Sequence, residues 1–474
     1  MRPLFFSGPL RAPLWLVGCL VAGPALAAEG LDGAAMSPLW AIPFCGVLLS
    51  IALGPLLLPH VWHAHYGKAG LAWALLIMAP LVWAYGAGVA AGALFHVLAL
   101  EYLPFILMLF ALFTAAGGLV IRGNLHGSPL VNTGFLLGGS LLASLIGTTG
   151  ASMVLVRPLI RANDNRRHNV HVFVFFIFLV ANIGGSLTPL GDPPLFLGFL
   201  RGVSFFWTTT HLWSQTVFAL AILLGLFFAM DSWLYRKEGV VPRDPAPDSD
   251  LRVTGLVNVA LIGVAVAAII MSGLWKPGVG VTILGTRLEL QNLLREVVMV
   301  GVGLASLALT KKADRRANGF SWEPLAEVAK LFAAIFVCII PVMAMLQAGA
   351  AGPFSAVVGL VTRADGSPDD AAYFWLTGLL SSFLDNAPTY LVFFELAGGD
   401  PARLMGAQAS TLAAISLGAV FMGANSYIGN APNFMVYAIA RGSGVKMPSF
   451  FGYMLWSGAI LLPLFALLTF VFLR

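Results

Sequence analysis

Two stretches of the sequence resemble each other and interrupt segments that are otherwise apolar. Residues 185–196 read GSLTPLGDPPLF, and residues 423–434 read GANSYIGNAPNF. Two glycines, one proline and one phenylalanine coincide, and the aspartate at position 192 corresponds to an asparagine at position 430. Glycine permits backbone conformations that other residues avoid, and proline ends a helical segment sharply. The stretches therefore predict a break within each of two apolar helices.

The composition places these breaks inside a membrane. Hydrophobic residues make up 59% of the 474 residues and charged residues 10%, with a mean hydropathy of +0.89. An ordinary globular chain carries about 25% charged residues, so this chain cannot cover a soluble fold. We therefore expect an all-α polytopic membrane protein whose partner is the lipid bilayer. The net charge of +5 is typical of basic cytoplasmic loops and indicates no nucleic-acid partner.

Apolar runs predict the spanning helices, and broken runs predict the functional region. Uniform candidate spans cover 38–58, 70–92, 101–121, 212–234, 253–273, 292–310, 326–348 and 450–473. The stretches 130–162, 170–202 and 369–441 are apolar but contain Gly, Pro, Asn, Asp or Ser. Irregular backbone at membrane depth is tolerated only where it is buried in protein or lines a cavity. Function is therefore expected at these interruptions.

A second polar break lies upstream of each repeated stretch. It reads GTTGAS at 147–152 and SFLDNAP at 382–388. We interpret these breaks as the tips of two re-entrant hairpins, at 130–162 and 369–399. Each hairpin is followed by a broken helix, at 170–202 and 408–441.

The two halves form a predicted inverted-topology repeat, the organisation common in secondary transporters. In this arrangement the hairpins open to opposite sides of the membrane. The first repeat covers 37–234, a cytoplasmic linker covers 235–252, and the second repeat covers 253–474.

The N-terminus predicts a signal peptide at 1–27. Arg2 precedes an apolar run at 12–21, which is followed by an A-x-A cleavage pattern at Ala25 to Ala27. The alternative is an uncleaved first helix. With cleavage, the mature N-terminus lies outside a bacterial-type cytoplasmic membrane. Lys and Arg are then concentrated in the inner segments, as the positive-inside rule requires.

Two acidic residues, Asp192 and Asp385, sit in the polar breaks rather than in loops. A carboxylate inside a membrane is costly and is a functional candidate. Burial favours its protonated form and a nearby cation favours its ionised form. One carboxylate can therefore hold either H⁺ or Na⁺, and this competition would couple Na⁺ export to proton entry. The alternative is that each aspartate caps the N-terminus of a half-helix.

Other polar residues are weaker candidates. Glu101 and Glu395 could lie on a proton path, but we expect an interfacial position for both. His60, His63 and His65 could bind metal or sense pH, but we expect them in a solvated cytoplasmic loop. Na⁺ is the metal expected at the cation sites, with no transition metal and no cofactor.

The motifs resemble those of a known group of carriers. Residues 182–194 are similar to the Asn-Ile-Gly-Gly…Gly-Asp-Pro-Pro signature of the ion transporter superfamily, and residues 381–389 to its Phe-Leu-Asp-Asn-x-Pro hallmark. The superfamily includes NhaD-type sodium:proton antiporters, arsenite permeases, and citrate and dicarboxylate transporters. The stretch 191–203 also resembles a bacterial group labelled either as citrate transporters or as sodium:proton antiporters.

The resemblance implies an elevator-type carrier, usually a homodimer, with a scaffold part and a moving part that holds both hairpins. By matching motifs, one cation site would use Thr148, Thr149, Ser152, Thr188 and Asp192. The other would use Asp385, Asn386, Thr389, Ser426 and Asn430. The hairpins and breaks would be shaped by Gly185, Gly191, Pro193, Pro194, Pro388, Gly423, Gly429 and Pro432.

Three transport functions fit these residues. The leading hypothesis is Na⁺(Li⁺)/H⁺ antiport. The alternative is cation-coupled transport of citrate or another organic anion, although the basic residues Arg157 and Arg201 lie only at the edges of the broken segments. A third is arsenite efflux. No HExxH, GxSxG or Walker A motif is present, so we expect no enzyme. Paired inverted hairpins favour alternating access over a channel.

Overall fold

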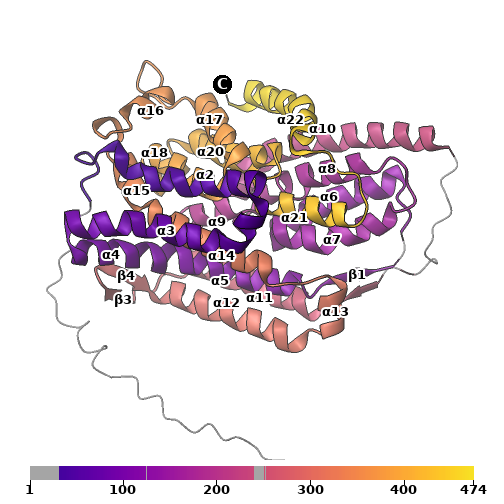
Figure 1. Cartoon of the computed structure of the whole chain (residues 1–474), viewed down its shortest axis with the longest axis horizontal. Coiled ribbons are helices and arrows are strands. Elements are labelled where there is room, and N and C mark those ends of the chain that lie inside the picture. Colours follow the sequence, from indigo (N-terminus) through magenta and orange to yellow (C-terminus); the bar gives the residue numbers. More distant parts are fainter. Residues whose placement is uncertain (1–30, 124, 240–249, 251, 474) are drawn as a thin grey trace, which may run out of the picture.

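The computed structural model describes residues 31–123, 125–239, 250 and 252–473. The predicted signal peptide at 1–27 lies outside these residues, as does most of the predicted linker at 235–252. Throughout the described part the fold is helical, with two short β-ribbons (Figure 1).

The helices of the first half follow closely on one another. In order they are η1 (Pro38–Ala41), α2 (Ile42–Leu57), α3 (Pro59–Tyr85), α4 (Ala87–Val97), the π-helical turn η2 (Leu98–Tyr102), α5 (Leu103–Ala116), α6 (Pro129–Ile146), α7 (Thr148–Ala162), α8 (Val170–Leu179), η3 (Ile183–Leu187), α9 (Pro193–Leu200) and α10 (Trp207–Glu238). The strand β1 (Val120–Arg122) follows α5.

The second half begins with strand β2 (Arg252–Thr254), which pairs antiparallel with β1. The strands β3 (Gly280–Ile283) and β4 (Thr286–Glu289) form a second antiparallel ribbon. The helices are α11 (Val257–Leu274), α12 (Leu290–Leu309), α13 (Lys312–Ala317), α14 (Glu323–Cys338), α15 (Ile340–Gln347), η4 (Gly349–Ala351), α16 (Ser355–Leu360), α17 (Asp370–Phe383), α18 (Asn386–Leu396), α19 (Pro401–Met405), α20 (Ala409–Met422), η5 (Gly423–Asn425), α21 (Ala431–Gly442) and α22 (Phe450–Phe472).

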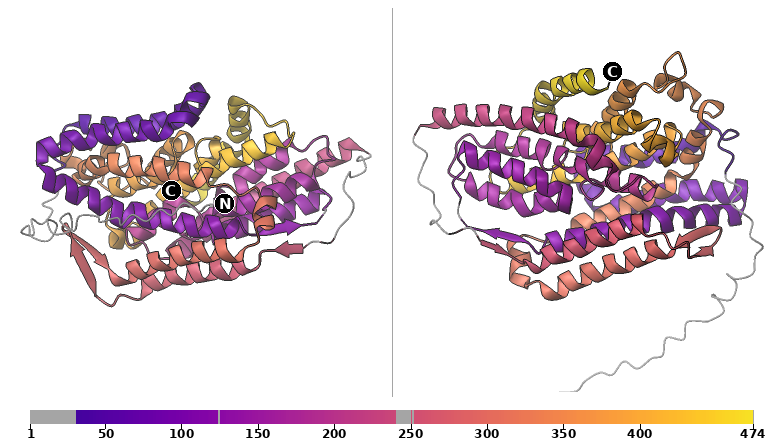
Figure 2. Two further views of the ribbon diagram at one scale, coloured as in Figure 1. Left: turned by 60° about the horizontal axis from the view of Figure 1, so that its bottom comes forward. Right: turned by 180° about the vertical axis from the view of Figure 1, so that it is seen from behind.

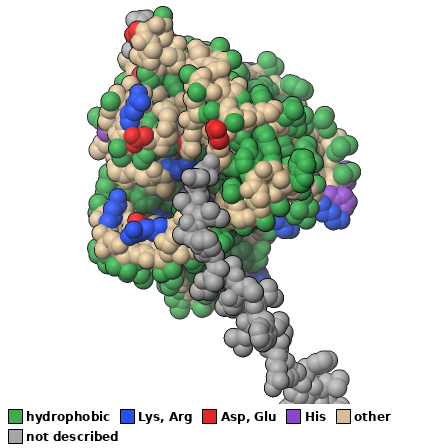
Figure 3. Space-filling model, turned by 90° about the vertical axis from the view of Figure 1, so that its left-hand side faces the viewer, with side chains coloured by type: hydrophobic (Ala, Val, Ile, Leu, Met, Phe, Trp, Pro, Cys, Tyr) green, Lys and Arg blue, Asp and Glu red, His purple; other side chains and the backbone are tan. Residues whose placement is uncertain are grey.

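Length and hydropathy identify a multi-pass membrane protein. Among the described residues, 9 helices are long and apolar enough to cross a membrane, or 10 if the bent pair α14 and α15 is one span. Large apolar side chains face outward, such as Trp83 (91% exposed) and Leu455 (76% exposed). Figure 3, which faces the left-hand end of the molecule in Figure 1, shows hydrophobic side chains gathered over its right half. Lipid, rather than water, is the solvent that such a surface requires.

Most long helices run along the long axis of the molecule, which therefore has two distinct ends (Figures 1 and 2). One end carries α13 and the β1–β2 ribbon, and we call it the α13 end. The other carries the β3–β4 ribbon, and we call it the β3–β4 end.

The helices pack as two bundles. The support bundle contains α2 to α5 and α11 to α15, with α3 packed on α2 and α14 and with α5 packed on α11 and α12. The hairpin bundle contains α6 to α10 and α17 to α22, in which α17 packs on α20, α9 on α18, and α7 on α21. Contacts between the bundles are fewer and join α5 to α7, η2 to α9, and α15 to α18.

The breaks are buried in the hairpin bundle. The segment Val170–Leu187 is 89% buried over its apolar window, whereas Trp207–Glu238 is 28% buried. Interior backbone that leaves the α-helix at η3 and η5 is thus surrounded by protein, as a low-dielectric environment requires.

A buried polar cluster fixes the open end of the α6–α7 hairpin. The carboxylate of Asp231 in α10 is fully buried, and Arg166 Nη1 lies 2.6 Å from its Oδ1. His171 Nε2 lies 2.8 Å from the same oxygen, and Asn132 Nδ2 donates to Oδ2 at 3.0 Å. These contacts tie α6 and the loop after α7 to α8 and α10.

Three expectations about the first spans are wrong. His60, His63 and His65 lie in helix α3 rather than in a loop, because Pro59 starts that helix and aromatic residues continue it. The third span begins at Ala87, well before residue 101. Glu101 therefore lies in the middle of that span and is 4% exposed, not interfacial.

Two further expectations need correction. The predicted uniform span at 326–348 bends by 44° between α14 and α15. Pro341 in the first turn of α15 lacks the N–H that a continuous helix would use. Glu395 is 1% exposed near the end of α18, so it is buried in protein rather than exposed at the surface.

Candidate functional site

The turn of the first hairpin contacts the first break. Gly147 joins α6 to α7 with φ of 84°, a conformation that favours glycine. The next residue, Thr148, donates its N–H to the carbonyl of Gly191 at 2.8 Å. The tip of the hairpin therefore lies directly on the unwound backbone between η3 and α9.

Close backbone approach explains the repeated glycines. A Cβ atom on Gly191 would lie 2.1 Å from the carbonyl oxygen of Gly185. In the second half, a Cβ on Gly429 would lie 2.6 Å from the carbonyl oxygen of Gly423. Each break therefore folds back on itself at a distance that only glycine allows.

Prolines start the helices that follow these turns. Pro193 and Pro194 open α9, and Pro432 lies in the first two residues of α21. Pro388 lies in the first turn of α18. At these positions the missing N–H costs no helical hydrogen bond.

Corresponding hydroxyls make the same contacts in the two halves. Thr188 Oγ1 donates to the carbonyl of Ser144, and Ser426 Oγ donates to that of Ser382 at 2.5 Å. Donor and acceptor are 44 residues apart in both cases. The hydroxyls therefore fasten each break to the first arm of its hairpin, which is a positioning role.

Side chains from both halves meet at Asp192, which is 1% exposed. Its Oδ1 accepts hydrogen bonds from Thr148 Oγ1 at 2.9 Å and from Asn430 Nδ2 at 3.1 Å. Its Oδ2 accepts a hydrogen bond from Asn386 Nδ2. Residues that the sequence assigned to two separate sites thus surround one carboxylate.

The partners of Asp192 carry no positive charge. All three donors are neutral side chains. Asn386 Oδ1 is buried beside Asp192 without a hydrogen-bond partner in the described part of the chain. A buried carboxylate in such surroundings requires a proton or a cation to balance its charge.

Asp385 has a different environment. Its side chain caps α18 by accepting a hydrogen bond from the N–H of Ala387 at 3.0 Å. Asp192 precedes α9 but makes no such capping bond. Asp385 therefore caps a helix and Asp192 does not, and capping leaves Asp385 a candidate ion ligand.

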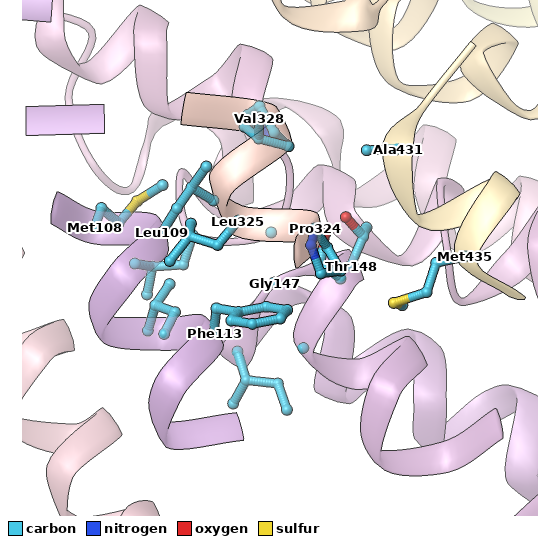
Figure 4. Close-up of a pocket in the computed structure, with 17 residues that line it drawn as sticks. Met108, Leu109, Phe113, Gly147, Thr148, Pro324, Leu325, Val328, Ala431 and Met435 are labelled. Atoms are coloured by element: carbon cyan, nitrogen blue, oxygen red, sulfur yellow. The ribbon is translucent and has the colours of Figure 1, made fainter. Parts of the chain in front are cut away.

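Among the described residues, the other predicted side chains make no hydrogen bond to Asp192. Thr389 Oγ1 donates to the carbonyl of Asp385 at 2.9 Å. Ser152 Oγ is buried and has no hydrogen-bond partner among the residues that the structure describes. Thr149 lines a small cavity of about 80 Å³ between α5, α7 and α14. Figure 4 shows the hairpin tip facing α14 of the support bundle across this cavity.

Two buried asparagines form a second layer that the sequence analysis missed. Asn182 Nδ2 donates to Asn433 Oδ1 at 2.7 Å, and Asn430 Nδ2 donates to Asn182 Oδ1 at 3.2 Å. Asn433 Nδ2 also donates to the carbonyls of Gly423 at 2.8 Å and Ser426 at 3.0 Å. Each is an amide side chain in an apolar segment next to a break, and this feature of the sequence could have identified both as candidates.

A larger cavity of about 470 Å³ reaches the site from the α13 end. It lies between the two bundles, with Asp385 and Asn430 at its inner end. Its other polar lining residues include Arg157, His63, Ser321, Glu323 and Glu327. The described residues give Arg157 no hydrogen bond or ion pair, so its guanidinium is free to meet a solute.

A comparison with known proteins identifies the family of the chain. The model of a family described as "Putative citrate transport" matches residues 33–473. The chain belongs to this family. The resemblance to the ion transporter superfamily is thereby confirmed, and the protein is a transporter and not an enzyme.

Two curated relatives of this citrate transport family member are themselves described as uncharacterized transporters. One is from Mycobacterium bovis and one from Mycobacterium tuberculosis. Each is 25% identical over 334 residues, which is 68% of this chain and 72% of the relative. The matches therefore extend across most of both chains.

Proposed function

We propose that the protein is a secondary transporter of the cytoplasmic membrane that exchanges Na⁺ (or Li⁺) for H⁺, with Asp192 as the shared carboxylate. The observation that carries this proposal is a buried acid held by three neutral donors. With H⁺ bound, the acid is neutral. With Na⁺ bound, the ion's charge balances it, and Asn386 Oδ1 is a further oxygen available nearby. One group then serves both ions, so they cannot bind together.

Alternating access follows from movement of the hairpin bundle against the support bundle. In support, the site is built entirely from the hairpin bundle, while the 470 Å³ cavity lies between the bundles. The free ends of the hairpins also lie at opposite ends of the molecule. Arg161 of α7 donates to Ile121 in β1, whereas Glu395 of α18 contacts Arg201 at the other end. This arrangement fits an inverted repeat and an elevator-type motion.

We place the α13 end in the cytoplasm. Basic residues support this orientation, because Arg122, Arg252, Lys311, Lys312, Arg315 and Arg316 lie on or next to α13 and the β1–β2 ribbon. Cytoplasmic loops carry an excess of Lys and Arg. The 470 Å³ cavity then opens toward the cytoplasm.

A second candidate function is cation-coupled transport of citrate or a similar organic anion. The family description favours it. So does Arg157, whose guanidinium lines the cavity without an ion-pair partner among the described residues. In this case the cation at Asp192 would drive uptake, and Arg157 would meet a carboxylate of the substrate.

Everted membrane vesicles distinguish the two functions. With a respiration-generated pH gradient, adding Na⁺ or Li⁺ alone should collapse the gradient if the protein is an antiporter. Asp192→Asn should abolish this response. Asp365→Asn, which changes an exposed carboxylate between α16 and α17, is the matched control. No response to either cation, with labelled citrate uptake that requires Na⁺, would reject antiport and support the second function.

A further inference from the structure

A buried charged cluster lies at the β3–β4 end, away from the candidate site. Arg201 Nη2 lies 2.8 Å from Glu101 Oε1, and Arg201 Nη1 lies 2.5 Å from Glu395 Oε1. Gln347 Nε2 donates to Glu395 Oε2 at 3.1 Å. The side chains of Glu101 and Glu395 are 6% and 1% exposed, so these contacts are largely screened from water.

The cluster joins the two bundles. Arg201 follows α9 and Glu395 lies in α18, both in the hairpin bundle. Glu101 lies in η2 and Gln347 at the end of α15, both in the support bundle. The contacts Arg201–Glu101 and Gln347–Glu395 therefore cross the interface, whereas Arg201–Glu395 stays within the hairpin bundle.

The charges are arranged so that the bundles can separate. Parting them breaks the two crossing contacts but leaves Arg201 and Glu395 as a balanced pair on the hairpin bundle. A pair that stays intact avoids the large cost of an isolated buried charge. Glu101 remains on the support bundle and loses Arg201, so opening has a cost at this residue.

The position of Glu101 also fits a contact that forms and breaks. It lies in a π-helical turn within one long span, and such turns occur frequently at functional positions in helices. Its Oε2 has no hydrogen-bond partner among the described residues. Glu101 therefore depends on Arg201 for its charge balance in this state.

We propose that Glu101–Arg201 and Gln347–Glu395 form a latch that holds the two bundles together at the β3–β4 end. At this end a cavity of about 660 Å³ reaches residues next to the latch, such as Leu100 and Gly202. The latch holds the bundles together between this cavity and the 470 Å³ cavity at the α13 end. It must open when the hairpin bundle moves. The inference rests on the proposed movement of the bundles but not on which solute is carried.

Hydrogen exchange of the full-length protein in lipid nanodiscs tests the latch. Glu101→Gln replaces the ion pair between Glu101 and Arg201, which crosses the interface, by a neutral contact. Arg201 and Glu395 remain a balanced pair, so the variant should fold. We expect about tenfold faster amide exchange at 196–204 and 394–400, the factor for loss of one charge-assisted hydrogen bond. We also expect slower exchange at 319–330, which lines the cavity at the α13 end, because that cavity closes when the latch opens.

The matched control is Glu296→Gln. Glu296 also pairs with an arginine, Arg295 at 2.6 Å, but both residues lie in α12, so the pair does not cross the interface. Gln347→Leu should reproduce the pattern of Glu101→Gln through the other crossing contact.

The latch would be supported if Glu101→Gln and Gln347→Leu both exchange faster at the β3–β4 end and more slowly at the α13 end, and if Glu296→Gln shows neither change. Faster exchange at the β3–β4 end alone, or no difference from Glu296→Gln, would overturn it. Because no transported ion enters this measurement, a latch can be found even if the vesicle assay rejects Na⁺/H⁺ exchange.

Discussion

Replacing Asp192 by asparagine should remove cation binding while leaving the fold intact. The carboxylate accepts from Thr148 and Asn430 on one oxygen and from Asn386 on the other. An asparagine can keep its oxygen toward the first two donors. Its amide nitrogen then faces Asn386, whose free Oδ1 can accept after a flip of that side chain. The net change is therefore at most about one hydrogen bond, or roughly 1 kcal/mol.

The effect of Na⁺ on stability should be much larger than this difference. A ligand that binds only the folded state stabilises it by about 2.7 kcal/mol at a concentration of 100 times Kd. Thermal unfolding of the purified wild type should therefore shift upward in saturating NaCl, relative to the same concentration of choline chloride. Asp192→Asn should show no such shift, because a neutral amide cannot balance the charge of Na⁺.

Proton competition adds a second readout. If one proton and one Na⁺ share Asp192, the apparent Na⁺ affinity should rise with pH, by up to about tenfold per pH unit while the proton is bound. Asp365→Asn removes an exposed carboxylate outside the site and controls for loss of one negative charge. A Na⁺-dependent shift that survives in Asp192→Asn would refute Asp192 as the cation-binding group. A wild-type Na⁺ affinity that does not change with pH would refute the competition.

Three other substitutions test the framework around the site. Gly191→Ala should prevent folding, measured as loss of the monodisperse peak in size-exclusion chromatography, because its Cβ would lie 2.1 Å from a carbonyl oxygen; Gly301→Ala, with nothing within 4 Å of its Cβ, should be tolerated. Asp231→Asn should destabilise the protein by about 1.5–3 kcal/mol, because the short Arg166–Asp231 contact is lost and Arg166 keeps only the longer contact with Glu238, at 3.5 Å; an unchanged melting temperature would contradict this. Arg157→Gln should leave a Na⁺/H⁺ exchange intact but should reduce uptake if the substrate is an organic anion, measured with labelled citrate.

Local sequence patterns predicted much of the helical architecture. The predictions were wrong where polar residues inside a helix indicated a loop or the end of a span. The run of histidines near residue 60 looked polar enough to leave the membrane, but Pro59 and the aromatic residues after it start α3 there. Glu101 looked like the start of a span for the same reason. Its partner Arg201 is 100 residues away in the chain, so no local pattern indicated that its charge is balanced inside the protein.

For the candidate site, too, the sequence predicted single residues but not which of them meet. The sequence pointed to Asp192 and Asn386 separately, since each follows a polar break in an apolar segment. That both lie in one hydrogen-bonded cluster depends on the packing of α9 against α18. Asn182 begins the signature at 182–194, but neither it nor Asn433 was predicted as a site residue, because only their mutual contact shows that they support the site.

The sequence by itself determined that this is a polytopic helical membrane protein with two interrupted helices. Hydropathy adds up along the chain, and glycine and proline act on the backbone where they stand. The tertiary structure decided which polar groups meet. Asp192 and Asn430 are 238 residues apart, and whether such groups touch depends on how whole helices pack. Whether a buried charge has a partner of opposite charge is therefore a property of the fold. Asp192 has none among its hydrogen-bond donors and is a candidate ion site, whereas Arg201 pairs with Glu101 and is part of the proposed latch.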